Sequence, residues 1–208
     1  ALNGISFSME KGEMLGYIGP NGAGKSTTVK ILSGILVPDS GSVSVLGLTP
    51  WKNRVQVAER IGVVFGQRTQ LWWDLPVVES FDLLRDIYRV PIRDYRRNLD
   101  ELTELLGLFP LFHIPVRQLS LGQRVRCDLA ASLLHGPDIL FLDEPTIGLD
   151  AVTKLAFRDF IRRLNQVKGV TVILTTHDMD YIEALCRRVI VIHEGGIYQD
   201  GTLEQLRS

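Results

Sequence analysis

The chain has 208 residues, of which 45% are hydrophobic and 23% charged, and its formal net charge is −1. This length allows one domain with a sizeable core, and the near-zero charge provides no overall field to attract nucleic acid, so we expect no nucleic-acid partner. No apolar run approaches the roughly 20 residues that span a bilayer. Cys127 and Cys186 have no metal-ligand or CxxC spacing, which predicts two buried, reduced thiols.

Short apolar runs alternate with amphipathic stretches in the first third of the chain. Residues 2–7 predict a half-buried strand, and residues 41–46 alternate in polarity like an exposed strand of a sheet. Residues 14–18 and 61–65 predict two apolar strands. The apolar run 14–18 is followed by a glycine-rich loop and then by a predicted helix, which starts at Lys25 and stops near Gly34.

The middle of the chain predicts a helical insert over about residues 77–135. Its three helices are expected at 77–89, 94–106 and 120–135, with Pro91 ending the first and Ser120 capping the third. Strands and helices alternate again after the insert, at 139–142, 152–167, 170–175, 178–185 and 189–193, before a hairpin turn at 194–196. This alternation predicts one α/β domain over residues 1–208, with a largely parallel sheet.

Residues 19–26 match the phosphate-binding pattern GxxxxGK[ST] in full, between a predicted strand and a predicted helix. Glycines let the backbone wrap so that N–H groups face phosphate oxygens, and the helix adds its positive end. Lys25 is expected to neutralise the β- and γ-phosphates, and Ser26 to ligate Mg²⁺. The pattern alone predicts a nucleoside-triphosphate site, which kinases, helicases and GTPases share. The expected contacts are Asn21, Gly22, Ala23, Gly24, Lys25, Ser26 and Thr27.

Two acids follow the apolar run 139–142, and a buried strand that ends in carboxylates delivers them to the edge where open α/β sheets bind ligands. We expect Asp143 to hold Mg²⁺ and Glu144 to act as the general base for the attacking water. The alternative is a strand end that solvates two acids.

Residues 119–124, Leu-Ser-Leu-Gly-Gln-Arg, resemble the LSGGQ signature of the ABC ATPase family, with Leu121 in place of the first glycine. The resemblance extends over nearly the whole chain. It implies that Ser120, Gly122 and Gln123 form a second anion site, which faces the γ-phosphate bound by another subunit, so that two domains enclose two ATP molecules. The alternative for Ser120 is an ordinary helix cap.

Three further positions match the family. Gln67 resembles the glutamine that reaches Mg²⁺ and the attacking water. His177 resembles the histidine that contacts the γ-phosphate, and Asp150 resembles the D-loop aspartate that bridges the subunits. Taken singly, Gln67 would be a solvated loop amide and His177 a structural histidine. The aromatic that stacks on adenine lies upstream of residues 1–7 in the family, so we expect the chain to be part of a longer protein.

The resemblance implies a P-loop NTPase (RecA-like) core with a mostly parallel sheet, a small antiparallel β subdomain and an inserted helical subdomain. It implies an ATPase that uses ATP and Mg²⁺, pairs with a second nucleotide-binding domain, and lies on the inner face of the cell membrane through a transmembrane permease. Trp72 and Trp73 border the family's groove for that permease, although both could instead pack under the helical insert.

Residues 121–124 and 127–131 resemble the drug-resistance and polysaccharide-export branch of the family, which favours export. The alternatives are an importer ATPase, a soluble ABC protein of translation or repair, and a non-catalytic cassette. Degenerate cassettes typically lack the equivalents of Glu144 or His177, and this chain has both.

Overall fold

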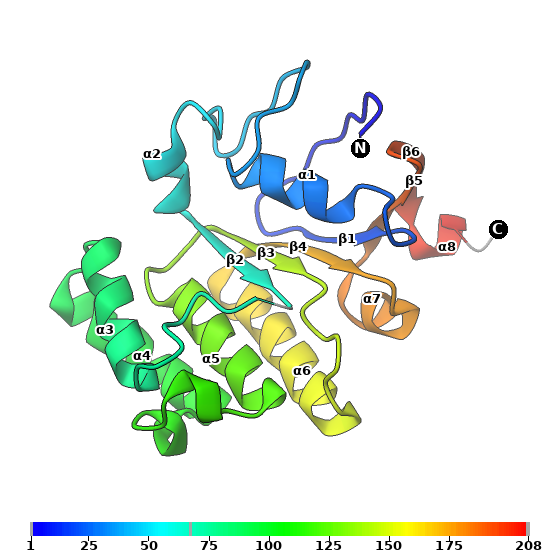
Figure 1. Ribbon diagram of the computed structural model, residues 1–208. Helices are drawn as coiled ribbons and strands as arrows, with labels where there is room; N and C mark the ends of the chain where they lie inside the picture. The colour runs from blue at the N-terminus through cyan, green and yellow to red at the C-terminus, as the bar shows by residue number, and fades with distance from the viewer. Residues whose placement is uncertain (1, 67, 207–208) are drawn as a thin grey trace.

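A six-stranded sheet lies at the centre of the computed structural model, which describes residues 2–66 and 68–206 (Figure 1). The strand order is β2-β3-β4-β1-β5-β6; the first five strands are parallel, and β6 is antiparallel to β5. The strands are β1 (Met14–Ile18), β2 (Ile61–Phe65), β3 (Ile139–Asp143), β4 (Thr171–Thr176), β5 (Arg188–His193) and β6 (Gly196–Thr202).

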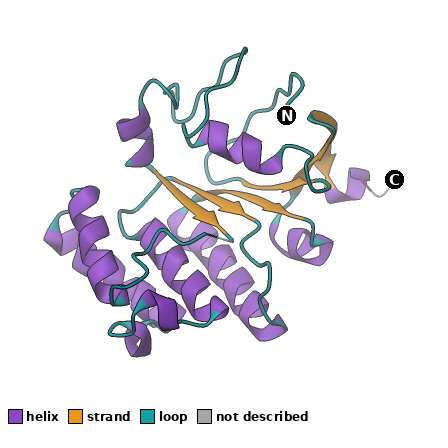
Figure 2. Cartoon of the chain, viewed as in Figure 1, coloured by secondary structure: helices purple, strands orange, loops and turns teal. Residues whose placement is uncertain are grey.

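Helices cover both faces of the sheet (Figure 2). Helix α1 lies on one face, α5 and α6 lie on the other, and α3 and α4 lie outside α5 (Figure 1). Two 3₁₀ turns at Phe109–Leu111 and Val116–Gln118 connect α4 to α5. The helices are α1 (Lys25–Leu32), α2 (Arg54–Ala58), α3 (Val77–Ile87), α4 (Ile92–Leu106), α5 (Leu121–Leu133), α6 (Ala151–Lys168), α7 (Met179–Leu185) and α8 (Leu203–Leu206).

The central strands are buried on both faces, which is why their sequences are continuous apolar runs and not alternating ones. Leu140, Phe141 and Leu142 of β3 are each at most 1% exposed. One hydrophobic cluster lies between the sheet and the helical insert with α6, and a second lies on the α1 side. The mostly parallel sheet and the helical insert are therefore confirmed.

Two expected strands do not form. Residues 2–7 and 41–46 have no regular strand, and the second segment makes only an isolated bridge between Val45 and Leu48. Their apolar side chains, including Phe7 and Val43, still pack against the cluster on the α1 side. The pattern of residues 2–7 therefore predicted a half-buried face correctly, but neither segment forms the expected hydrogen-bonded ladder. In the described part of the chain, regular antiparallel pairing is that of β5 with β6.

Within the described ranges, none of the helices is both long and apolar enough to cross a bilayer.

Candidate functional site

The carboxyl ends of three neighbouring parallel strands bring most of the predicted catalytic residues together. The glycine-rich loop follows β1, Asp143 ends β3 with Glu144 directly after it, and His177 follows β4. Strand β4 pairs with both β1 and β3, so these three strand ends are adjacent. Ligands bind at this edge in open α/β folds.

The loop after β1 has the backbone geometry of an anion site. Gly22 and Gly24 have φ angles of 82° and 113°, which side-chain-bearing residues rarely adopt. Gly24 is the N-cap of α1 and provides no side-chain cap, so the N–H groups of the first turn remain available to an anion. Lys25 is 6% exposed, and its Nζ donates to the carbonyl oxygens of Gly19 and Pro20 at 2.7 and 3.2 Å.

Glu144 lies between the loop lysine and the histidine after β4. Its Oε1 is 3.5 Å from Lys25 Nζ, and its Oε2 is 3.1 Å from His177 Nδ1. Glu144 has a φ of 49°, an uncommon backbone conformation that aims its side chain into this group. Its Oε1 is buried and accepts no hydrogen bond from any residue that the structure describes. A buried carboxylate oxygen that has a cation beside it but no hydrogen bond is available to a polar ligand.

Thr175, which the sequence analysis missed, organises both acids. Its Oγ1 donates to Asp143 Oδ1 at 2.6 Å, and its carbonyl oxygen accepts from Glu144 N at 3.0 Å. Thr175 is completely buried in β4. A pair of threonines at the end of an apolar strand was the only signal in the sequence, because the contact with Asp143 depends on the pairing of β3 with β4.

Replacing Thr175 with valine is expected to weaken Mg²⁺ binding by about 10- to 100-fold, the usual effect of losing a hydrogen bond to a ligating carboxylate. Valine keeps the shape of the side chain but removes the donor to Asp143. Titration of Mg²⁺ at saturating ATP measures the change. Thr171, which is 5% exposed at the other end of β4, gives the matched control: a T171V variant with the same Mg²⁺ requirement as T175V would contradict this role.

Gln67 lies outside the described residues. The residue before it is tied to the catalytic edge, since Gly66 N donates to the carbonyl oxygen of Asp143 at 2.9 Å. A Cβ at Gly66 would lie 2.0 Å from the carbonyl oxygen of Glu144, so only glycine allows this approach. The loop that contains Gln67 therefore starts in contact with the acidic pair.

Ser120 is both an exposed residue and a helix cap. Its Oγ accepts from Gln123 N at 3.3 Å, and Gln123 Oε1 accepts from Ser120 N at 2.8 Å, which together form a capping box at the start of α5. Helix α5 lies on the opposite face of the sheet from α1 (Figure 1). Among the described residues, no hydrogen bond or ion pair joins residues 119–123 to residues 19–27 of the same chain.

Leu121, the departure from the signature pattern, packs against the segment that follows Glu144. A Cβ at Gly148 would lie 2.8 Å from Leu121 Cδ2, and a Cβ at Gly122 would lie 3.3 Å from the Thr153 side chain. The small residues at 122 and 148 therefore allow the start of α5 to approach the D-loop and the start of α6. The larger side chain at 121 fits because it contacts a glycine.

Asp150 caps α6 in this chain. Its carboxylate accepts from Thr153 N at 2.9 Å and from Thr153 Oγ1 at 2.7 Å. These hydrogen bonds hold the pKa of Asp150 below its ordinary value, as expected for a carboxylate at a helix N-terminus. A contact of Asp150 with a second subunit stays a prediction.

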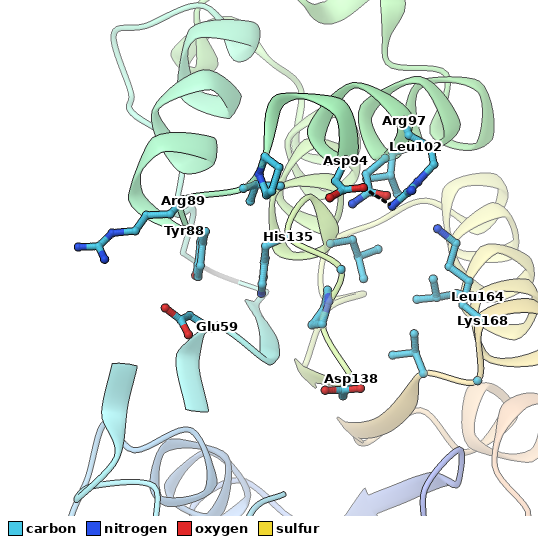
Figure 3. Close-up of a pocket in the computed structure, with 18 of the residues that line it drawn as sticks. Glu59, Tyr88, Arg89, Asp94, Arg97, Leu102, His135, Asp138, Leu164 and Lys168 are labelled. Atoms are coloured by element: carbon cyan, nitrogen blue, oxygen red, sulfur yellow. Dashed lines mark ion pairs between the residues drawn. The ribbon is translucent and has the colours of Figure 1, made fainter. Parts of the chain in front are cut away.

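A cavity of about 740 Å³ lies at the other edge of the sheet, between the helical insert and the core (Figure 3). Glu59, Asp138 and Val170, which line it, lie near the amino ends of β2, β3 and β4. The rings of Tyr88 and His135 stack in its wall, 4.1 Å apart. It contains none of the predicted site residues, which lie at the carboxyl ends of the strands.

The comparisons with known proteins point to one family. The family model described as ABC transporter matches residues 2–147. The ABC transporter ATP-binding protein NatA of Bacillus subtilis is 34% identical over 99% of this chain and 83% of its own length. "Probable multidrug ABC transporter ATP-binding protein YbhF" of Escherichia coli is 37% identical, and the chain spans only 36% of it. The methionine import ATP-binding protein MetN 2 of Enterococcus faecalis is also 37% identical, over 97% of the chain and 59% of the relative.

Solved structures agree. An ATP-binding subunit of an ABC transporter superposes with a TM-score of 0.90 at 27% identity, covering 99% of this chain and 85% of that one. The dimeric cassette MJ0796, bound to ADP and Pi after hydrolysis, superposes with a TM-score of 0.86 at 27% identity, covering 97% of this chain and 90% of that one. The family match, the identity to NatA and the phosphate loop after β1 agree, and the chain therefore belongs to the ABC transporter family as an ATP-binding domain.

Proposed function

We propose that this chain binds and hydrolyses Mg·ATP as the ATPase subunit of a membrane transporter. The observation that carries the proposal is the convergence of Lys25, Glu144 and His177 at one edge of the sheet. In this proposal Lys25 releases Glu144 when it binds the β- and γ-phosphates, and Glu144 accepts a proton from the attacking water. His177 holds the other carboxylate oxygen and contacts the γ-phosphate. The unit is one cassette over residues 1–208, with residues 77–135 as its signature subdomain.

Mg²⁺ fits the oxygen donors that the edge provides. Asp143 is 8% exposed and uses one carboxylate oxygen to accept from Thr175, so its second oxygen can face a cation. Ser26 adds a hydroxyl in the first turn of α1, and Gln67 is proposed to add an amide oxygen. Hard oxygen ligands together with substrate phosphates are the usual environment of Mg²⁺ in proteins. When bound, the ion neutralises charge on the phosphates.

A second copy or a related cassette would complete each site. Ser120 is exposed and the first residues of α5 are partly exposed. Helix α5 lies on the opposite face of the sheet from α1 (Figure 1). The dimeric form of MJ0796 supports a paired assembly. We expect the pair to be head-to-tail, so that one subunit's Ser120 faces the other subunit's nucleotide. The free N–H groups at the start of a helix suit an anionic phosphate.

Trp72 and Trp73 support a membrane-protein partner. They are 38% and 50% exposed, so neither is packed fully under the helical insert. Trp73 is held in place by Arg124, whose guanidinium lies 5.6 Å from the centre of its ring, and by a hydrogen bond from Arg117 N to its carbonyl oxygen. Ordered, exposed aromatic side chains are characteristic anchors of protein interfaces. We propose that this loop contacts the permease at the inner face of the membrane.

The proposal predicts that the chain, isolated from its native membranes, copurifies with a polytopic membrane protein. The double variant W72A/W73A is expected to lose this partner and to retain ATP binding, because the two side chains lie outside the nucleotide edge. Tyr198, which is 79% exposed on β6, provides the control variant Y198A. Full recovery of the membrane protein with W72A/W73A, or its equal loss with Y198A, would contradict the assignment.

Export is the proposed direction, because residues 121–124 and 127–131 resemble the export branch and YbhF is described as a multidrug transporter protein. MetN 2 is described as an import protein at similar identity. Deletion of the gene discriminates between the two: an exporter's loss sensitises cells to a toxic compound, and an importer's loss creates a nutrient requirement.

A further inference from the structure

A buried carboxylate on α5 holds the segment that follows Gln67. Asp128 lies about two turns along α5 from Ser120 and is 5% exposed. Its Oδ1 accepts from Thr69 Oγ1 at 2.7 Å and from Gln70 N at 3.1 Å, and its carbonyl oxygen accepts from Gln70 Nε2 at 3.1 Å. Three hydrogen bonds thus fix two consecutive loop residues to one residue of the helix.

The loop that contains Gln67 is attached at both ends, to two different parts of the protein. Before it, Gly66 N is bonded to the carbonyl oxygen of Asp143 in the sheet. After it, Arg68 N donates to the carbonyl oxygen of Phe65 at 2.9 Å, and Thr69 then bonds to Asp128 on the insert. The described residues on the two sides of position 67 therefore form a bridge between the acidic pair and the helix that Ser120 caps.

A carboxylate is a costly way to hold a loop in a buried position. Burial raises the pKa of Asp128 to about 6, although the hydrogen bonds from Thr69 and Gln70 and the positive charge of Arg124 favour its ionised form. An apolar residue at this position would leave the Thr69 hydroxyl and the Gln70 N–H without their acceptor. What Asp128 adds is a fixed position for the two donors, because a single oxygen atom accepts from both.

We propose that Asp128 is a positioning residue for ATP hydrolysis, which ties residues 69 and 70 to the signature helix so that movement of α5 carries the loop of Gln67 with it. When a second subunit's nucleotide draws Ser120 and α5 toward it, the bridge transmits that movement to the Mg²⁺ and water ligands of the same chain. The inference rests on the proposed roles of Gln67 and Ser120. Asp128 itself touches neither nucleotide nor metal.

Kinetics of the full-length protein in its native assembly test this coupling. D128A is expected to lower kcat by about 10-fold or more and to change the KM for ATP by less than about threefold, because the phosphate loop is untouched. T69V is expected to lower kcat in the same way, and the double variant T69V/D128A to be no worse than D128A, since one contact links them. D128N is expected to restore kcat, because its amide oxygen can accept both hydrogen bonds in place of Oδ1.

Ser132 provides the matched control. It is 2% exposed on the same helix, and its hydroxyl donates to the carbonyl oxygen of Leu129 within α5 at 2.7 Å. S132A is therefore expected to disturb the helix core without changing kcat. The inference would be overturned by a normal kcat in T69V and D128A, by additive losses in the double variant, or by a D128N variant as slow as D128A. If D128A does not fold, the kcat of T69V decides alone. An E144Q variant that still hydrolyses ATP would refute the proposed function itself.

Discussion

Replacing Glu144 with glutamine is expected to reduce ATP turnover by about 10²- to 10⁴-fold, the usual contribution of a positioned general base. The amide keeps the size of the side chain but cannot accept a proton from the attacking water. It also removes the charge that attracts Lys25 Nζ, 3.5 Å away, so that Lys25 is freer to bind phosphate. We therefore expect ATP binding to persist and an ATP-bound dimer to accumulate.

Three measurements check the E144Q variant: steady-state phosphate release, ATP affinity, and size-exclusion chromatography with and without ATP. Glu104, an exposed acid on α4, provides the control. The E104Q variant should match the parent in all three measurements. Turnover of E144Q within a few fold of the parent would refute the assignment of the general base, whatever its affinity for ATP.

The second large effect is expected at Ser120, which lies outside its own chain's nucleotide edge. Replacing Ser120 with aspartate keeps a good helix cap, because aspartate caps helices as well as serine does. It also introduces a negative charge where the start of α5 is proposed to meet a γ-phosphate. The S120D variant should therefore fold normally, bind ATP as a monomer and lose turnover and ATP-driven dimerisation.

The neutral cap S120N separates the effect of charge from that of the cap, and it should retain much more activity than S120D. Because each site is proposed to need a partner's Ser120, the specific activity of the parent protein should rise with protein concentration. A flat concentration dependence in a monomeric preparation, or equal activity in S120D and the parent, would contradict catalysis across a subunit interface.

Much of the proposed site could be predicted because its signals are local in sequence. The pattern of residues 19–26 and the acids after the apolar run at 139–142 each specify both an element and its chemistry. The structure places Lys25, Asp143, Glu144 and His177 together because β1, β3 and β4 are parallel neighbours. The helical insert was predictable for the same reason, since its helices have their own periodicity and their own proline and serine boundaries.

Features that depend on contacts between distant segments could not be predicted. The role of Thr175 depends on the pairing of β3 with β4, and the role of Asp128 depends on where the loop after β2 crosses α5. The expected strands at 2–7 and 41–46 were wrong because alternating polarity reports burial of one face, and strand formation also needs a partner ladder.

Mixing two inactive variants tests the composite site most directly. The K25A variant lacks the lysine that binds phosphate but keeps Ser120. The S120D variant keeps Lys25 but has aspartate at position 120. A mixed dimer therefore contains one site with both Lys25 and Ser120 and one site with neither. In complexes with the membrane partner, where pairing does not depend on ATP, random pairing would give about a quarter of the parent's activity, because half of the dimers are mixed and each has one of two sites intact. We predict this recovery of phosphate release when the two proteins are combined. A mixture no more active than the sum of its separate components would contradict the account.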